Sequence, residues 1–137
     1  MKTHTTNYFN TLIEIAEDCP VSESVIPPEK KEKTIANLQY DFLIKSPYKY
    51  TSDDIIFNCN MIKNDILESE KAEEKLKFFS KGQARLRTSP LAKRYGFGIH
   101  HNDKGKVAII PAESKEYHDL VENNSVKKVK AMRSKRK

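Results

Sequence analysis

The segment 97–110 constrains the fold most, because it contains two apolar runs separated by a short polar turn. Phe97–His101 and Lys106–Ile110 flank Asn102-Asp103-Lys104-Gly105, and Asn, Asp and Gly are residue types typical of tight turns. Strands joined by so short a loop pair in antiparallel fashion. The segment therefore predicts a β-hairpin, and with it a sheet that is at least partly antiparallel.

Two further segments are assigned to this sheet. Residues 8–16 alternate like a strand but also fit helical spacing, and a strand is favoured because the element is short and Pro20 follows closely. Residues 84–88 also alternate, which predicts a strand with Arg85 and Arg87 on one face and Leu86 on the other.

Helix signals occupy most of the remaining chain. Thr34–Lys45 has helical apolar spacing and ends before Pro47. Thr51 and Asp54 form an N-terminal capping pattern that favours a helix over 55–62, although the alternation there also fits a strand. Residues 65–79 predict a charged helix with a thin apolar stripe at Ala72, Leu76 and Phe79, closed by a left-handed Gly82.

Two short helices are predicted in the second half. Ser89-Pro90 is a start signal for a helix that reaches Tyr95 and is closed by Gly96. Ser114 caps another helix, with Tyr117 directed inward. These elements predict a single α+β domain over 1–124, a small, mainly antiparallel sheet with helices packed on one face, followed by a basic, helix-capable C-terminal tail over 125–137.

Positive charge is concentrated in two segments of the chain. The net charge is +6, but residues 1–80 carry −4, residues 81–106 carry +6, residues 107–124 carry −3 and residues 125–137 carry +7. Without its last 13 residues the chain is near neutral, at −1. The charge asymmetry therefore directs the search for a partner to the central basic segment and the tail.

The central basic segment predicts an anion site. Two guanidinium groups on one strand face, next to the N-terminus of the Ser89-Pro90 helix, suit a phosphate or a carboxylate. His100 or His101 could face the same place, but adjacent strand residues point in opposite directions, so only one of them can. The candidate residues are Arg85, Arg87, Ser89, Lys93, Arg94 and His100. The structural alternative is that both arginines pair with the acids of 65–74 and that Ser89 only caps the helix.

The tail carries seven basic residues between 127 and 137 and no aromatic one. Such a segment can bind RNA or DNA by releasing counterions, without reading sequence and without a stacking platform. Lys127, Lys128, Lys130 and Arg133 are its candidate contacts. The structural alternative is a solvated terminus that aids solubility.

Metal, cofactor and covalent chemistry find no support in the sequence. The four histidines lack metal-ligand spacing, and Cys19 and Cys59 lie 40 residues apart, so neither a metal site nor a disulfide framework is predicted. The acids beside Cys19 make it a weaker nucleophile. Cys59 lies in an apolar run, which predicts that it is buried. We expect no cofactor and no metal.

Several stretches resemble a known family. They are Asn10–Glu14, Ala16–Pro20, Pro47–Asp54, Phe79–Gln83, Arg87–Gly96 and Gly98–His100, and the likeness extends over nearly the whole chain. They are similar to a bacterial family of small proteins described only as a domain of unknown function, family 6157. Phe97 stands where the family has Trp, an aromatic replacement. The resemblance implies a bacterial, cytoplasmic protein and implies no activity, cofactor or catalytic residue.

The functional expectation is a module that binds nucleic acid or a phosphorylated small molecule through the central basic segment and the tail. One alternative is an enzyme with Arg85 and Arg87 as clamps and His100 or His101 as general base. Another is a protein-interaction module. The longest apolar run has four residues, too few to span a membrane, and the N-terminal residues show no apolar segment typical of a secretion signal. We therefore expect a cytoplasmic protein with no membrane partner.

Overall fold

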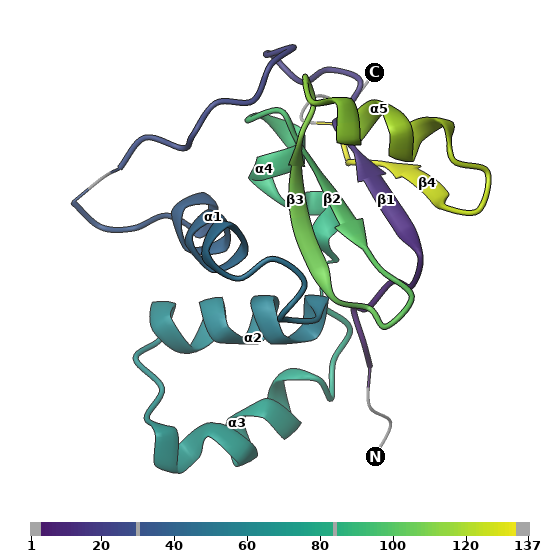
Figure 1. The fold of residues 1–137 in the computed structure, drawn as a ribbon. Coiled ribbons are helices and arrows are strands. Elements are labelled where there is room, and N and C mark those ends of the chain that lie inside the picture. Colours follow the sequence, from purple (N-terminus) through teal and green to yellow (C-terminus); the bar gives the residue numbers. More distant parts are fainter. Residues whose placement is uncertain (1–3, 30, 84, 134–137) are drawn as a thin grey trace.

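The computed structural model describes residues 4–29, 31–83 and 85–133 (Figure 1). Helices and strands alternate irregularly along the chain. In order, they are β1 (Thr11–Glu14), α1 (Ile35–Lys45), α2 (Ser52–Lys63), η1 (Glu68–Glu70), α3 (Lys71–Phe78), η2 (Leu86–Thr88), α4 (Pro90–Lys93), β2 (Phe97–His101), β3 (Val107–Pro111), α5 (Lys115–Glu122) and β4 (Lys127–Lys130). The predicted α+β class is confirmed.

The four strands form one sheet in the order β3-β2-β1-β4. β2 and β3 form the predicted hairpin, and β1 pairs antiparallel with β2, with Leu12 opposite His100. β4 runs parallel to β1 at the edge of the sheet, where Leu12 lies opposite Lys128. The strand favoured for 8–16 is therefore confirmed, and the sheet is antiparallel in two of its three pairings.

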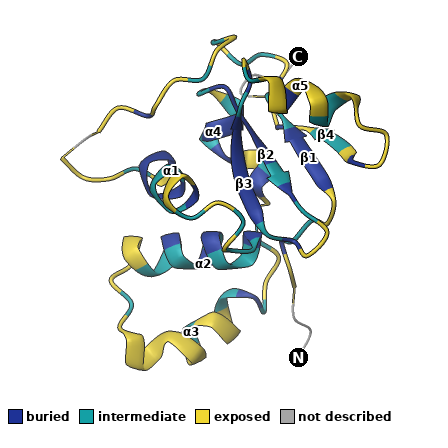
Figure 2. Cartoon of the chain, in the orientation of Figure 1, coloured by how far each residue is buried: buried dark blue, intermediate teal, exposed yellow. Residues whose placement is uncertain are grey.

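The larger core lies on one face of the sheet. Ile13 and Ile99 project from β1 and β2 and pack with Leu38 of α1, Ile55 of α2 and Leu91 of α4, all of which are buried (Figure 2). A buried Leu or Ile side chain stabilises a fold by about 1.5–3 kcal/mol relative to an exposed one. This core therefore fixes α1 and α4 against the sheet and against each other.

A smaller core lies on the opposite face, under α5. Leu12, Ala108 and Ile110 pack there around Tyr117. The ring of Tyr117 lies so close to β2 that a Cβ atom at Gly98 would be 2.5 Å from its Cε2 atom. Helices therefore cover both faces of the sheet, which extends the expected arrangement with helices on one face.

The first two helices begin where their side chains cap the backbone. Thr34 accepts a hydrogen bond from the backbone N–H of Asn37, whose side chain in turn accepts one from the backbone N–H of Thr34. Thr51 and Asp54 make the same reciprocal pair. Such a capping box satisfies N–H groups that the helix itself leaves unpaired. The helical alternative for 55–62 is confirmed.

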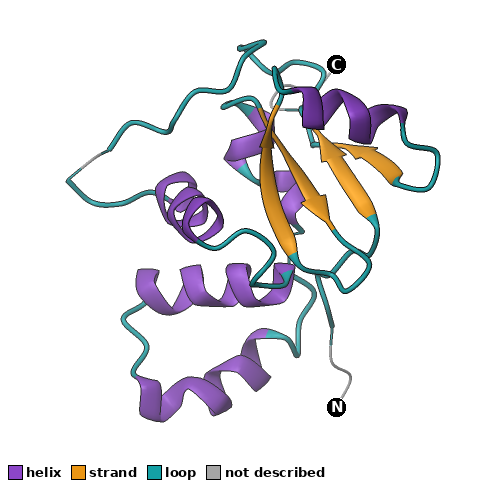
Figure 3. Cartoon of the chain, viewed as in Figure 1, coloured by secondary structure: helices purple, strands orange, loops and turns teal. Residues whose placement is uncertain are grey.

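Three conformational predictions are wrong, and Figure 3 shows the helices and strands that form instead. The single helix expected over 65–79 is interrupted, because Asp65 has a left-handed φ of 51°, and η1 precedes a short α3. Gly82 has no left-handed backbone, and the helix ends earlier, at Phe78. The helix-capable segment after 125 is instead the strand β4, because it forms hydrogen bonds with β1. This partner lies far away in the sequence, so local patterns do not reveal it. None of the described helices is long and apolar enough to cross a membrane.

We call residues 68–78, which comprise η1 and α3, the helical arm. None of its residues is buried, and it projects away from the sheet (Figure 2). Its attachment is aromatic: the ring of Phe78 meets the ring of the buried Phe57 of α2 at a centroid distance of 5.6 Å. Of the predicted apolar stripe, Ala72 and Leu76 are exposed and only Phe79 is buried.

Candidate functional site

Arg85 and Arg87 do not lie on a strand. Residues 86–88 form the single turn η2, in which the N–H of Ser89 donates to the carbonyl of Leu86. Leu86 is buried in the larger core and anchors this turn. The strand prediction is therefore wrong. It failed because one apolar residue between two polar ones fits such a turn as well as it fits a strand. Ala84, the first residue of the predicted strand, lies outside the described residues.

The two arginines make separate contacts. The guanidinium of Arg85 lies 4.9 Å from the ring centroid of Tyr8, a cation–π geometry, and also donates to the carbonyl of Asn7. The Nε atom of Arg87 donates to the carbonyl of Lys130 at 2.8 Å. The strand that was expected to place both arginines on one face is therefore absent. The structural alternative, pairing with the acids of 65–74, is not seen among the described residues either. Each arginine braces a chain segment next to η2.

Ser89 is the N-cap of α4, as predicted. Its buried hydroxyl accepts from the N–H of Leu91 at 3.2 Å and donates to the side-chain oxygen of Gln39 on α1. The amide of Leu91, at the helix N-terminus that was expected to face an anion, is thus already paired within the fold. Ser89 connects α4 to α1, and this connection positions a neighbouring pocket.

That pocket lies between the N-terminus of α1 and α4 and has a volume of about 420 Å³. It is within the size range of small-molecule sites, which is about 300–1,000 Å³. Two of the predicted cations, Lys93 and Arg94, line it. The full lining is Pro28, Thr34, Ile35, Ala36, Thr88, Pro90, Lys93, Arg94 and Tyr95. We call it the α1–α4 pocket.

Positive potential in the α1–α4 pocket comes from two sources. The first is the pair Lys93 and Arg94, neither of which forms an ion pair among the described residues. The second is the start of α1, where the N–H groups of Ile35 and Ala36 have no partner within the helix and carry its positive dipole end. The first turn of α1 contains no acidic residue, and none of the described residues that line the pocket carries a carboxylate.

The threonine hydroxyl groups of the α1–α4 pocket are already engaged. Thr34 Oγ1 donates to the side-chain oxygen of Asn37, and Thr88 Oγ1 donates to the carbonyl of Arg85. Pro90 has no N–H. The donors that remain for a ligand are the two cationic side chains, the first amides of α1 and the hydroxyl group of Tyr95, a set that suits an anion.

His100 and His101 lie on opposite faces of β2. His100 Nδ1 is 2.8 Å from Tyr48 Oη, and burial lowers the pKa of His100 while Glu116 opposes the shift. His101 is fully buried, with its ring edge-to-face against Tyr8 at a centroid distance of 5.2 Å. Burial lowers the pKa of His101 to about 4, so its imidazole is neutral at pH 7. Neither histidine shares a described contact with Lys93 or Arg94.

The basic residues of the C-terminal segment are distributed along and beyond β4. Lys127 and Lys130 are exposed at the edge of the sheet. Lys128 donates to the carbonyl of Asn123, and Arg133 lies 3.3 Å from the carboxylate of Glu17. Two of these four predicted contacts are thus bound to the chain itself, and two are free of ion pairs among the described residues.

Metal and thiol chemistry gain no support from the geometry. The described residues contain no cluster of three or more His, Cys, Asp or Glu that could hold a metal ion. Cys59 is buried as predicted, which raises the pKa of its thiol to about 12. A thiol with so high a pKa carries almost no thiolate near neutral pH.

Sequence reasoning missed the pocket residues contributed by α1, namely Ile35 and Ala36. The capping pattern at Thr34 showed that a helix begins there, but the approach of this helix end to α4 depends on the shared core.

A profile of a family of unknown function, DUF6157, matches residues 3–137. The chain belongs to this family. Searches of curated proteins and of solved structures find no match for it.

Proposed function

We propose that this member of the DUF6157 family is a binding module for a phosphate-bearing small molecule, held in the α1–α4 pocket. The observation that carries the proposal is the convergence of Lys93 and Arg94, neither ion-paired, on a pocket without a carboxylate. The amides at the start of α1 add donors of the same sign. Arg94 offers a planar fork that matches phosphate oxygens, and Lys93 offers a point charge.

Binding is favoured over catalysis in this pocket. Its lining contains no histidine, cysteine or carboxylate, the groups that most often act as general base or nucleophile. The imidazole of His100 instead contacts Tyr48 on the other face of the sheet. The enzyme alternative would therefore need Lys93 or Tyr95 as its base, or a base from the ligand or a partner. The free cysteines, Cys19 and Cys59, fit the reducing cytoplasm as the compartment of such a module.

The test measures stabilisation by ligand. Thermal unfolding is followed with inorganic phosphate and with a sugar phosphate, because a ligand that binds only the folded state raises its melting temperature. We expect both to stabilise the wild type, and the double variant Lys93→Gln/Arg94→Gln to lose at least about tenfold in affinity, since hydrogen bonds to charged groups contribute about 1.5–3 kcal/mol each.

The matched control is Lys127→Gln/Lys130→Gln, which removes the same charge from β4. Equal losses in the two double variants would show a general charge effect and refute the pocket assignment. No stabilisation of the wild type by either phosphate compound would refute it as well.

Binding of nucleic acid through the C-terminal segment is a second candidate, favoured by the exposed Lys127 and Lys130. Because β4 is part of the sheet, removing residues 125–137 would also remove a strand, so substitution is the sharper test. If this candidate is correct, Lys127→Gln/Lys130→Gln elutes earlier from heparin than Lys93→Gln/Arg94→Gln. The contribution should weaken steeply between roughly 50 and 200 mM salt.

A further inference from the structure

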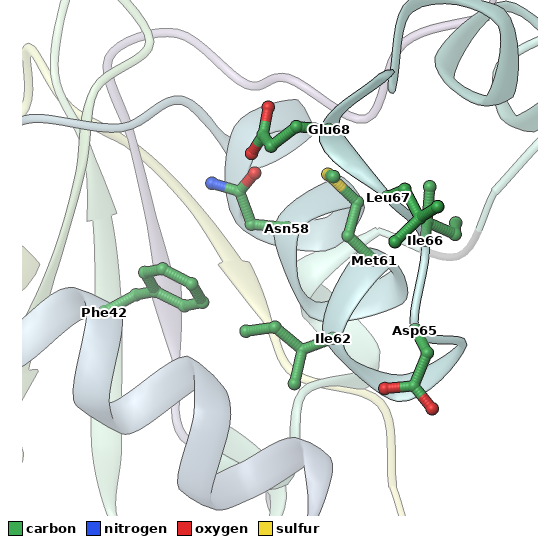
Figure 4. A pocket seen from close by; sticks show the side chains of 8 residues that line it. All are labelled: Phe42, Asn58, Met61, Ile62, Asp65, Ile66, Leu67 and Glu68. Atoms are coloured by element: carbon green, nitrogen blue, oxygen red, sulfur yellow. The ribbon is translucent and has the colours of Figure 1, made fainter. Parts of the chain in front are cut away.

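A second hollow lies on the other side of α1, along α2. Figure 4 shows its lining: Phe42 of α1 faces Met61 and Ile62 of α2, and the chain that follows α2 closes the far side. The hollow is an open groove with a volume of about 610 Å³. The full lining is Phe42, Asn58, Met61, Ile62, Asp65, Ile66, Leu67 and Glu68. We call it the α1–α2 groove.

The floor of the α1–α2 groove is apolar and accessible. Ile62 and Leu67 are 50% and 63% exposed, and Phe42, Met61 and Ile66 are only partly buried. Five apolar side chains thus line one hollow, and clustered apolar exposure marks docking surfaces far better than single exposed residues do. Met61 adds an adaptable surface, because its unbranched side chain can follow the shape of a partner.

The rim of the groove is acidic. Asp65 and Glu68 line it, and neither forms an ion pair among the described residues. None of the described residues that line the groove is basic. Two carboxylates nearby are paired: Asp41 binds Lys33, and Glu73 lies 3.6 Å from Lys77. The two unpaired carboxylates therefore form a negative edge beside an apolar floor, and this edge complements a cationic partner.

The geometry of the groove also selects the conformation of its partner. Its walls are side chains of α1, of α2 and of the turn after α2, and the backbone of both helices is hydrogen-bonded internally. No strand edge lines the groove, so an extended peptide could not add to a sheet there. A helix, by contrast, presents apolar anchors at i, i+4 and i+7 to a groove of this kind.

We propose that the α1–α2 groove docks an amphipathic helix of a partner protein, with apolar anchors on one face and Lys or Arg beside them. The anchors contact Phe42, Met61 and Ile62, and the basic residues pair with Asp65 and Glu68. The groove shares no lining residue with the α1–α4 pocket. This inference therefore goes beyond the proposed phosphate binding and stands or falls separately from it.

The test uses two labelled helical peptides of about four turns, which is about 14 residues. Both carry Leu at i, i+4 and i+7; one has Lys at the flanking positions and the other has Glu. Fluorescence anisotropy with the full chain measures each affinity. We expect the Lys peptide to bind at least tenfold tighter than the Glu peptide, although the chain itself has a net charge of +6.

Two double variants decide where the peptide binds. Asp65→Asn/Glu68→Gln removes the rim charges, and Asn at 65 tolerates the left-handed backbone there. Glu29→Gln/Glu32→Gln removes two exposed carboxylates outside the groove. The rim variant should weaken binding of the Lys peptide about tenfold, with a smaller salt dependence. The control should change it less than twofold.

Three results would overturn the proposal: no binding of the Lys peptide up to about 1 mM, a dissociation constant that corresponds to only about 4 kcal/mol; equal binding of both peptides; or equal losses in the two double variants. Size-exclusion chromatography with light scattering adds a fourth arm. If the wild type is a dimer and Ile62→Glu makes it a monomer, the groove holds a second copy of this chain and the partner-helix proposal is wrong.

Discussion

The sheet with its packed helices and the helical arm differ in what holds them in place. In the first region, Ile13 and Ile99 of the sheet and Leu91 of α4 are fully buried in one core. In the arm, residues 68–78, no residue is buried, and the attachment is the aromatic contact of Phe78 with Phe57. The burial of apolar surface therefore fixes the first region, whereas the second relies on local helix formation and one joint.

This difference bears on the two hollows. The α1–α4 pocket is lined by helices anchored in the larger core, so an anion would find its donors already in position. The α1–α2 groove has one wall on α2 and the other end at Leu67 and Glu68, where the arm begins. A partner there would meet a less firmly held wall. Segments with few buried contacts open at lower free energy, and binding surfaces that adjust are drawn from them.

The largest effect is expected at the joint. Phe57 is 1% exposed, and its ring contacts the rings of Phe78 and Phe79. Phe57→Ala should lower the free energy of unfolding by about 3–5 kcal/mol, because it removes a large buried ring and leaves a cavity. Urea denaturation measures the loss. Phe9→Ala, at a ring that is 57% exposed, is the matched control and should cost far less. Similar losses in the two variants would contradict the burial of the Phe57 ring at the joint between α2 and the arm.

The next effect concerns acid and the buried His101. Its ring nitrogens are buried, and burial lowers the pKa of His101 to about 4 although the backbone of Thr11 and Ile99 opposes the shift. The unfolded chain binds a proton near pH 6.5, whereas the folded chain does not until about pH 4. Stability should thus be complete above pH 6.5 and fall as the pH drops toward 4, by roughly 3 kcal/mol at about 1.4 kcal/mol per pKa unit.

His101→Phe isolates this contribution, because Phe keeps an aromatic ring against Tyr8 and cannot be protonated. Urea unfolding at pH 7 and pH 5 gives the change in stability for both chains. The variant should lose less stability on acidification than the wild type does. Identical pH dependence in the two chains would show that His101 does not titrate differently on folding and that other groups cause the acid sensitivity.

The sequence predicted those elements whose cause is local. Four such features are confirmed, and each depends on a few neighbouring residues. They are the hairpin turn at 102–105, the caps at Thr51 and Ser89, and the burial of Cys59. The family and the α+β class were likewise accessible.

The errors arose where distant packing decides the conformation. Lys127–Lys130 forms a strand because β1 offers its free edge, although three lysines in four residues suggest a solvated segment. Charged edge strands are common, because lysines discourage pairing with other chains. Arg85 and Arg87 were separated by a turn that Leu86 anchors in the core. Lys93 and Arg94 were in the predicted set, but the end of α1 that completes their pocket was not.

The smallest effect is expected in the arm itself. Leu76 is 68% exposed on α3, so Leu76→Ala removes little buried surface and substitutes a residue with a better helix propensity. The free energy of unfolding should change by less than about 0.5 kcal/mol, as for surface substitutions that touch no special feature. In native-state hydrogen exchange, amides of α3 should exchange well before those of β1 and β2, because the arm can open without exposing the core. A loss above about 2 kcal/mol, a value typical of removing a buried Leu side chain, would show that Leu76 packs against something in solution. Concentration dependence of that loss would identify a second copy of the chain as the contact, and the contrast between the two regions would then hold only for the isolated chain.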